Sequence, residues 1–262
     1  MKFVARFAGA ALICALVQGG AVAATAAQAG HIVNTPAKLK ISHDAVKSTN
    51  WSGYAAEGTA KFTDVVGTWV QPAVKCKGTS TRYSSFWVGI DGYSTDSVEQ
   101  LGTDSDCDGT TPSYYGWWEM YPANSVNLST SKYPVQAGDT LTAEVSVSGS
   151  TYTLSMHSSE GWTFTKAVTG SASLKQASAE WIAESPEICS ATCKLAKLAN
   201  FGTVGFTNCE AATGGADEPI SSFTTNSGPH EITMVTKKGV KRAVPSALNG
   251  TGNGFSIAWA HD

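Results

Sequence analysis

Apolar and polar side chains alternate along the stretch Thr140-Leu141-Thr142-Ala143-Glu144-Val145-Ser146-Val147. A period of two is that of a β-strand with one buried face. Gly149-Ser150 follows as a turn, and a second strand-like run covers residues 152–156, so a β-hairpin is predicted here. The same reasoning predicts a second hairpin from residues 231–235 and the chain after the turn at 237–239, and a last strand over 255–259.

The rest of residues 49–262 has the same texture, with strand-length runs rich in Val, Thr, Tyr and Trp that are broken by turn residues. One stretch, residues 193–200, favours a turn or two of helix instead. The length suits one domain with a sizeable core. We therefore predict an all-β domain over 49–262, built as an antiparallel two-sheet β-sandwich.

The N-terminal residues differ from this domain. Lys2 and Arg6 precede a short apolar run, and small residues at 21–23 and 27–29 offer cleavage sites, so residues 1–29 are predicted to be a signal peptide and the protein to be secreted and extracellular. Residues 30–48 hold three lysines, one Asp and no aromatic residue. They are interpreted either as a removable pro-segment or as a loose N-terminal arm, and both interpretations stay open.

Charge narrows the choice of partners. Residues 1–48 hold five of the 18 basic and one of the 21 acidic residues, which leaves 13 basic and 20 acidic residues, a net charge of −7, in 49–262. A mildly acidic domain without a basic stripe is not expected to bind nucleic acid. No further apolar stretch is long enough to span a membrane. We expect a monomer.

Five cysteines remain after the predicted signal peptide, and disulfides are expected in a secreted protein. The sequence does not fix the connectivity. The pairs that we expect are Cys76 with Cys107 and Cys189 with Cys193, which leaves Cys209 as a buried free thiol.

Several kinds of hydrolytic site are absent from the sequence. It contains no HExxH zinc motif, no G-x-S-x-G nucleophile elbow and no Asp-Thr/Ser-Gly pattern. The run Asp104-Ser105-Asp106-Cys107-Asp108-Gly109 resembles the start of an EF-hand loop, but the twelfth position is Tyr115 rather than the bidentate Glu. We predict a solvated turn there, and no metal or other cofactor.

Two polar residues on strand-like segments offer a hydrolytic mechanism without metal or nucleophile. The Glu184 carboxylate can take a proton from water, and the Gln100 carboxamide can donate a hydrogen bond to an oxyanion. Each also has an ordinary interpretation, because Glu184 can be an exposed residue of a polar strand face and Gln100 a strand-end residue.

Three asparagines, Asn50, Asn127 and Asn249, lie in N-x-Ser/Thr sequons.

Eight segments that include these residues resemble the glutamic peptidases, or eqolisins, and occur in the family's order over about residues 50–236. They are Asn50-Trp51-Ser52-Gly53, Trp69-Val70-Gln71-Pro72, Trp87-Val88-Gly89-Ile90-Asp91-Gly92, Gln100 with Gly102, Trp118-Glu119-Met120-Tyr121-Pro122, Gly138-Asp139, Ala179-Glu180-Trp181-Ile182-Ala183-Glu184 and Phe206-Thr207-Asn208-Cys209. The match is closer to a bacterial branch than to the fungal prototypes.

The resemblance implies a concanavalin-A-like β-sandwich whose concave sheet holds an acid endopeptidase site. It places the family's catalytic residues at Gln100 and Glu184, and site-lining or supporting residues at Trp51, Trp87, Asp91 and Glu119. Asp91 is interpreted as a turn former or as a partner that fixes Gln100, and Glu119 as a supporting carboxylate. The two tryptophans are interpreted as cleft walls, with plain core as the alternative.

Three positions depart from the family pattern. Tyr115 stands where the family has an acidic residue, Glu99 where the fungal enzymes have an apolar one, and Met120 where they have an aromatic one. These departures bear on the pH optimum and on subsite preference more than on the reaction.

Two other functions suit a sandwich with acidic and aromatic residues. Glu119 and Glu184 could be the paired carboxylates of a glycosidase, which needs a defined separation between them and does not need Gln100. A carbohydrate-binding module without catalysis would use the exposed aromatic residues alone.

Overall fold

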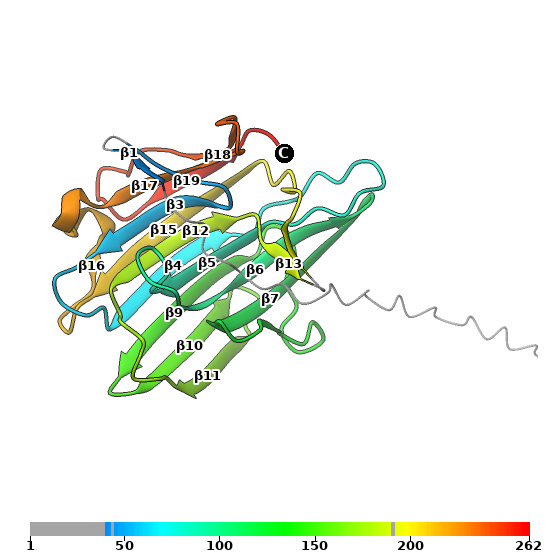
Figure 1. Ribbon diagram of the computed structural model, residues 1–262. Coiled ribbons are helices and arrows are strands. Elements are labelled where there is room, and N and C mark those ends of the chain that lie inside the picture. Colours follow the sequence, from blue (N-terminus) through cyan, green and yellow to red (C-terminus); the bar gives the residue numbers. More distant parts are fainter. Residues whose placement is uncertain (1–39, 43–44, 190–191) are drawn as a thin grey trace, which may run out of the picture.

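The computed structural model describes residues 40–42, 45–189 and 192–262, and nearly all of their regular structure is β (Figure 1). The strands are β1 (Lys40–Ser42), β2 (Ala45–Ser48), β3 (Trp51–Glu57), β4 (Asp64–Val70), β5 (Ser85–Ile90), β6 (Val98–Asp108), β7 (Thr111–Tyr121), β8 (Val126–Asn127), β9 (Thr140–Ser148), β10 (Thr151–Ser158), β11 (Thr163–Thr169), β12 (Ser178–Glu184), β13 (Glu187–Cys189), β14 (Cys193–Leu195), β15 (Thr203–Ala212), β16 (Glu218–Pro219), β17 (His230–Val235), β18 (Lys241–Pro245) and β19 (Phe255–Trp259). Two 3-10 turns, η1 (Ile220–Ser222) and η2 (Thr225–Ser227), lie between β16 and β17.

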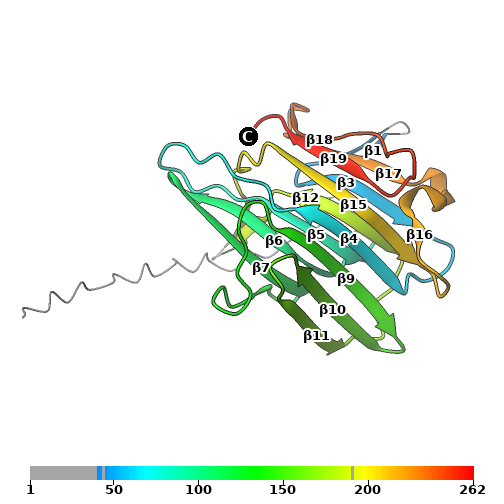
Figure 2. The ribbon, with the colours of Figure 1, turned by 180° about the vertical axis from the view of Figure 1, so that it is seen from behind.

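Strand pairing arranges the long strands in two layers. One layer runs β7-β6-β5-β12-β3-β17, and the other runs β19-β15-β4-β9-β10-β11, each with antiparallel neighbours. β18 pairs with both β17 and β19 and so joins the layers at one edge. Figures 1 and 2 show the molecule from its two sides. The predicted all-β sandwich is therefore confirmed.

The main core lies between the layers, because alternate residues of each strand point inward. The first layer contributes Val88 and Trp181, and the second contributes Trp69, Leu141 and Phe206, all essentially without exposed surface. Full burial of side chains of this size stabilises the fold by about 1.5–3 kcal/mol each.

The opposite face of the first layer carries a second buried cluster. It contains Trp51 from β3, Trp87 from β5, Trp117 from β7 and Ile182 from β12. This outer face, defined here as the face of β3, β12, β5, β6 and β7 that bears these residues, also carries the polar residues singled out in the sequence.

The predicted hairpins are confirmed as β9–β10 and β17–β18, and the last strand as β19. Both expected disulfides are present, Cys76–Cys107 and Cys189–Cys193, and Cys209 is a buried free thiol.

Two local predictions are wrong. Residues 193–200 form no helix, because Cys193 lies opposite Cys189 in the short β13–β14 hairpin that their disulfide closes. The run from Asp104 to Gly109 is not a solvated turn. Asp104 and Asp106 are buried within β6, and the turn starts only at Gly109, whose φ is +60°.

The N-terminal end of the described chain is part of the sheet. β2 pairs in parallel with β17, and Val46 is buried in the outer-face cluster. Ser48 Oγ accepts the backbone N–H groups of Asn50 at 3.2 Å and Trp51 at 3.0 Å. The boundary predicted between residues 48 and 49 therefore falls inside this arrangement. Residues 1–29, the predicted signal peptide, lie outside the described residues.

None of the helical segments in residues 40–42, 45–189 and 192–262 has the length and apolar character needed to cross a membrane.

Candidate active site

Strand register brings the polar residues of the outer face into two rows. Glu184 lies opposite Ser85, which lies opposite Asp104, which lies opposite Tyr115. In the second row the order across the same strands is Glu180, Gly89, Gln100 and Glu119. Directly opposite residues share a face of a sheet, so Glu184 and Gln100 lie on one face.

Glu184 ends β12 and has no exposed surface. Trp87 Nε1 donates to its Oε2 at 2.9 Å, and Asn50 Nδ2 donates to its Oε1 at 3.0 Å. Burial raises the pKa of Glu184 from 4.5 to about 8, against the lowering effect of these donors, and the charge of Asp104 raises it further. Each carboxylate oxygen thus has a donor, so the group is held in one orientation.

Gln100 is also fully buried, and its Nε2 donates to Glu119 Oε2 at 2.6 Å. This contact settles which end of the amide is which, a question that the sequence leaves open. The nitrogen keeps a second N–H, and Oε1 accepts no hydrogen bond within the described part of the chain. Glu119 therefore orients the Gln100 amide.

The indole of Trp87 lies between the two predicted catalytic side chains. Its Nε1 touches Glu184, and its Cζ3 lies 3.1 Å from the point where a Cβ would stand at Gly89. Gln100 Cβ also lies 3.1 Å from that point. A side chain at Gly102, between Gln100 and Asp104 on β6, would collide with the backbone of Phe86. The absence of both side chains lets β5 and β6 pair closely and lets the indole pack against Gly89.

Trp51 packs edge-to-face on Trp87, with ring centroids 5.0 Å apart. Its Nε1 has no hydrogen bond of good geometry within the described chain, yet it lies close enough to Glu184 to lower the pKa of that carboxyl. Both tryptophans are buried, and both lie beside the Glu184 carboxyl.

Asp91 holds a loop. Its φ is +70°, and its carboxylate accepts the backbone N–H groups of Lys175, Gln176 and Ala177 at 2.8–3.0 Å. Its carboxylate also interacts with Glu99, and it has no hydrogen bond to Gln100 in the described chain. Of the two roles considered for Asp91, the geometry therefore supports the turn-forming one.

Sequence reasoning assigned Asn50 no role in the site and named it only as a sequon and as part of a segment that matches the family. Its side chain is 1% exposed and donates to Glu184, so it is not available to a glycosyltransferase in the folded chain. The signal was present in the segment Asn50-Trp51-Ser52-Gly53. Sequence reasoning also missed the acidic pair Asp104 and Asp106, which the outer face buries beside Tyr115.

Arg242 fixes the two chain segments that carry Asn50 and Glu184. It is 5% exposed, and its guanidinium donates to Thr49 O at 3.0 Å and to Ser185 Oγ at 3.2 Å. The backbone N–H of Ser185 in turn donates to Asn50 O at 2.8 Å. These hydrogen bonds hold together the residues next to Asn50 and Glu184, and they thereby place the donor Asn50 beside the acceptor Glu184.

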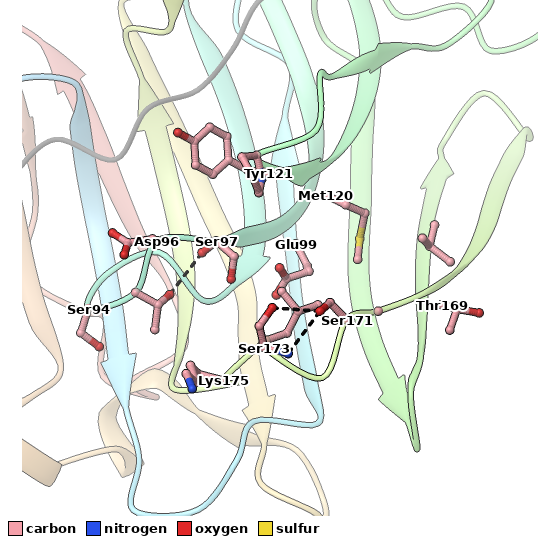
Figure 3. Close-up of a pocket in the computed structure, with 15 residues that line it drawn as sticks. Ser94, Asp96, Ser97, Glu99, Met120, Tyr121, Thr169, Ser171, Ser173 and Lys175 are labelled. Atoms are coloured by element: carbon pink, nitrogen blue, oxygen red, sulfur yellow. Dashed lines mark hydrogen bonds between the residues drawn. The ribbon is translucent and has the colours of Figure 1, made fainter.

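A pocket of about 600 Å³ lies elsewhere, between the loop after β5, the end of β7 and the segment after β11 (Figure 3). Neither Glu184 nor Gln100 lines it. Glu99 does, because neighbouring residues of β6 point to opposite faces. Burial, and then the charge of Asp91, raises the pKa of Glu99 to about 9. Glu99, which departs from the family pattern, therefore lies on the opposite sheet face from the Gln100 amide.

Within the described residues, one group of side chains has metal-ligand spacing, Glu187 with Cys189 and Cys193. Both cysteines are bonded to each other, so they offer no thiolates. Glu184 is not part of that group.

Comparison with known proteins identifies the family of this chain. A family model described as the Peptidase A4 family matches residues 49–245. Aspergillopepsin-2 of Aspergillus niger is 30% identical over 218 residues, which cover 74% of each chain.

Solved structures agree in fold. A crystal structure of scytalido-glutamic peptidase with a transition state analog inhibitor gives a TM-score of 0.70 at 24% identity, over 81% of this chain and 98% of that one. The aspergilloglutamic peptidase of Aspergillus niger gives a TM-score of 0.57 at 25% identity, over 68% of this chain and 99% of that one.

Trp87→Phe tests the hydrogen bond to Glu184, because it removes the indole donor and keeps an aromatic ring. A hydrogen bond to a charged group contributes about 1.5–3 kcal/mol, so the pKa of Glu184 should rise by about one to two units. The measurement is a ¹³C NMR titration of the full chain with labelled glutamate carboxyls.

Trp162→Phe is the control, since the Trp162 indole donates to Pro134 O in the other layer. It should leave the Glu184 titration unchanged. An unchanged titration in Trp87→Phe as well would show that the indole does not act on this carboxyl.

Proposed function

The chain belongs to the Peptidase A4 family and is a glutamic endopeptidase, and from this premise we propose that Glu184 and Gln100 carry its chemistry. One observation supports the pair above all. A carboxyl held by two donors and a carboxamide oriented by a second carboxyl flank one indole ring on the same sheet face.

The proposed reaction uses one group as base and then as acid. Ionised Glu184 takes a proton from a water, whose oxygen forms a bond to the carbonyl carbon of the substrate. The carbonyl oxygen becomes negative, and the N–H of Gln100 that does not face Glu119 donates to it. Glu184 then gives its proton to the leaving nitrogen as the C–N bond breaks.

Water access decides the pH at which Glu184 can start this reaction. A general base must be ionised, and with a pKa of about 8 most Glu184 is protonated in acid. Burial is the largest cause of that shift. Opening the outer face to water would remove this cause and return the pKa toward 4.5, which makes Glu184 a usable base at mildly acidic pH. We therefore assign acid action to an opened form of the enzyme.

The site of the full chain is closed, because Glu184 and Gln100 have no exposed surface. A removable N-terminal segment, proposed from its basic charge beside an acidic domain, would explain how the site opens. The contacts of Val46 and Ser48 with the domain support a shorter segment than residues 30–48, and we propose that the cut falls before Ala45. Attraction between segment and domain weakens as carboxylates protonate, so acid should release it.

We also propose that the enzyme is secreted, acts on protein or peptide substrates and works as a monomer. The two disulfides suit an oxidising compartment. The glycosidase alternative gains nothing from the geometry, because the Glu119 carboxylate accepts the Gln100 amide and two strands separate β7 from β12.

Glu184→Gln and Gln100→Ala should each lower kcat against denatured casein at acidic pH by at least about 10²-fold, because loss of one oxyanion donor costs 10²–10³. Wild-type cleavage should be insensitive to EDTA, pepstatin and serine-directed inhibitors. The matched control is Glu180→Gln on the same strand. Burial raises the pKa of Glu180, so a neutral amide resembles its protonated form and should leave kcat within a few-fold of wild type.

The proposal fails if Glu184→Gln keeps wild-type kcat, or if EDTA abolishes cleavage. A polysaccharide panel assayed with the same protein tests the glycosidase, which would release sugar and spare casein.

Three versions of the chain test the N-terminal segment: residues 30–262, 45–262 and 49–262. At pH 6, residues 45–262 should cleave casein and residues 30–262 should not, whereas at about pH 4 both should be active after N-terminal processing of the longer one. Residues 49–262 should be less stable, because burial of a Val side chain contributes about 1.5–3 kcal/mol. Equal activity of 30–262 and 45–262 at both pH values, without processing, would refute the inhibitory role.

A further inference from the structure

The hydroxyl of Tyr115 lies at hydrogen-bond distance from two buried carboxyls. Its Oη is 2.9 Å from Asp104 Oδ2 and 2.8 Å from Asp106 Oδ2. A phenol has one proton and can donate it to one acceptor only. Burial and the two nearby carboxyls raise the pKa of Tyr115 well above 10, so the phenol does not ionise. The second contact therefore requires a proton from one of the carboxyls.

The partners of each carboxyl indicate where that proton sits. Asp104 receives Trp117 Nε1 at 2.6 Å as well as the Tyr115 hydroxyl, and Ser85 also favours its ionised form. Asp106 receives one other donor, the backbone N–H of Ser84 at 3.1 Å. Burial raises the pKa of Asp104 to about 6 and that of Asp106 well above 3.8, with the charge of Asp104 adding to the latter. The larger number of donors to Asp104 favours Asp104 as the ionised member.

We propose that Asp106, Tyr115 and Asp104 form a directed relay, in which protonated Asp106 donates to Tyr115 and Tyr115 donates to ionised Asp104, and that this relay keeps a negative charge beside Glu184. Asp106 and Tyr115 are positioning residues in this account, which rests on the proposed role of Glu184. No proton leaves the relay during the reaction. The negative charge that the relay keeps on Asp104 sets the electrostatic environment in which Glu184 gains and loses its proton.

Register connects the relay to Glu184. Asp104 and Glu184 lie in one row with only Ser85 between them, and the charge of Asp104 raises the pKa of Glu184. The other titratable groups that act here are Tyr83, whose pKa burial and these aspartates raise, and Asp108, which is exposed. Neither aspartate has an ion pair with a Lys or Arg side chain among the described residues. The charge of Asp104 is thus balanced by hydrogen bonds alone.

The relay also gives a physical meaning to the departure at Tyr115. A tyrosine stands where the family resemblance predicts an acidic residue opposite Asp104, and Asp106, two residues along the same face of β6, supplies a second carboxyl. The tyrosine connects the two carboxyls through its one hydroxyl.

Tyr115→Phe removes the central hydroxyl and provides the main test. Asp104 should then protonate more readily, so its charge beside Glu184 should be lost already at higher pH values than in the wild type, and the ¹³C titration of Glu184 should move down by about one pH unit. Asp104→Asn should produce a shift in the same direction and keeps the test valid if the phenylalanine variant does not fold.

Asp106→Asn is the discriminating control. Its amide can donate to Tyr115 Oη and accept the Ser84 N–H, as protonated Asp106 does, so the Glu184 titration should stay at its wild-type value. A shift equal to that of Tyr115→Phe would overturn the relay, and so would an unchanged titration in Asp104→Asn. The titration does not require turnover, so the relay can stand even if casein cleavage fails.

Discussion

Burial of carboxyl groups on a sheet face where no Lys or Arg side chain pairs with them is the constraint on which the described structure depends. Glu184, Asp104, Asp106 and Glu180 lie on one sheet face with 3% exposure or less, and Glu99 is buried behind them. Among the described residues, Arg242 is the one Lys or Arg side chain that is buried, and it serves the β12 end and Asp262. Charged carboxylates cannot be kept in such a place without compensation, so the face must take up protons or supply donors.

Proton uptake and hydrogen-bond donors divide the buried carboxyls into two groups with different roles. Glu184 and Asp104 have a donor to each oxygen, from Asn50 and Trp87 for the first and from Trp117 and Tyr115 for the second. Those two can therefore ionise within a moderate pH range. Glu99 and Glu180 have fewer donors, and burial leaves them protonated well above their usual range. The pattern separates carboxyls that can do chemistry from those that only need to be neutral.

Much of the fold was predictable from the sequence. Apolar and polar side chains that alternate with a period of two show which face of a strand is buried, and this holds for any order of the strands in the sheet. The β9–β10 and β17–β18 hairpins followed from local patterns, and both disulfides are the expected pairs among connectivities that the sequence left open. The acidic run at Asp104 was misread, since acidic residues with loop-like spacing are usually solvated. Its burial depends on β5 and β7, which reach it from elsewhere in the chain. For the same reason the partner of Gln100 and the donor role of Asn50 could not be predicted, because each is set by contacts between distant segments of the chain.

The pH dependence of unfolding tests this account most directly. Every shifted carboxyl, including Asp64 with a pKa of about 8, has a higher pKa in the fold than the ordinary 3.8 or 4.5. The folded chain then binds more protons than the unfolded one, so this stabilisation is complete below pH 4 and is lost as the pH rises through the folded values of about 6 to 9. Urea unfolding of the full chain from pH 4 to pH 8 should show a free energy of unfolding that falls as the pH rises. A free energy that rises over this range would contradict the account.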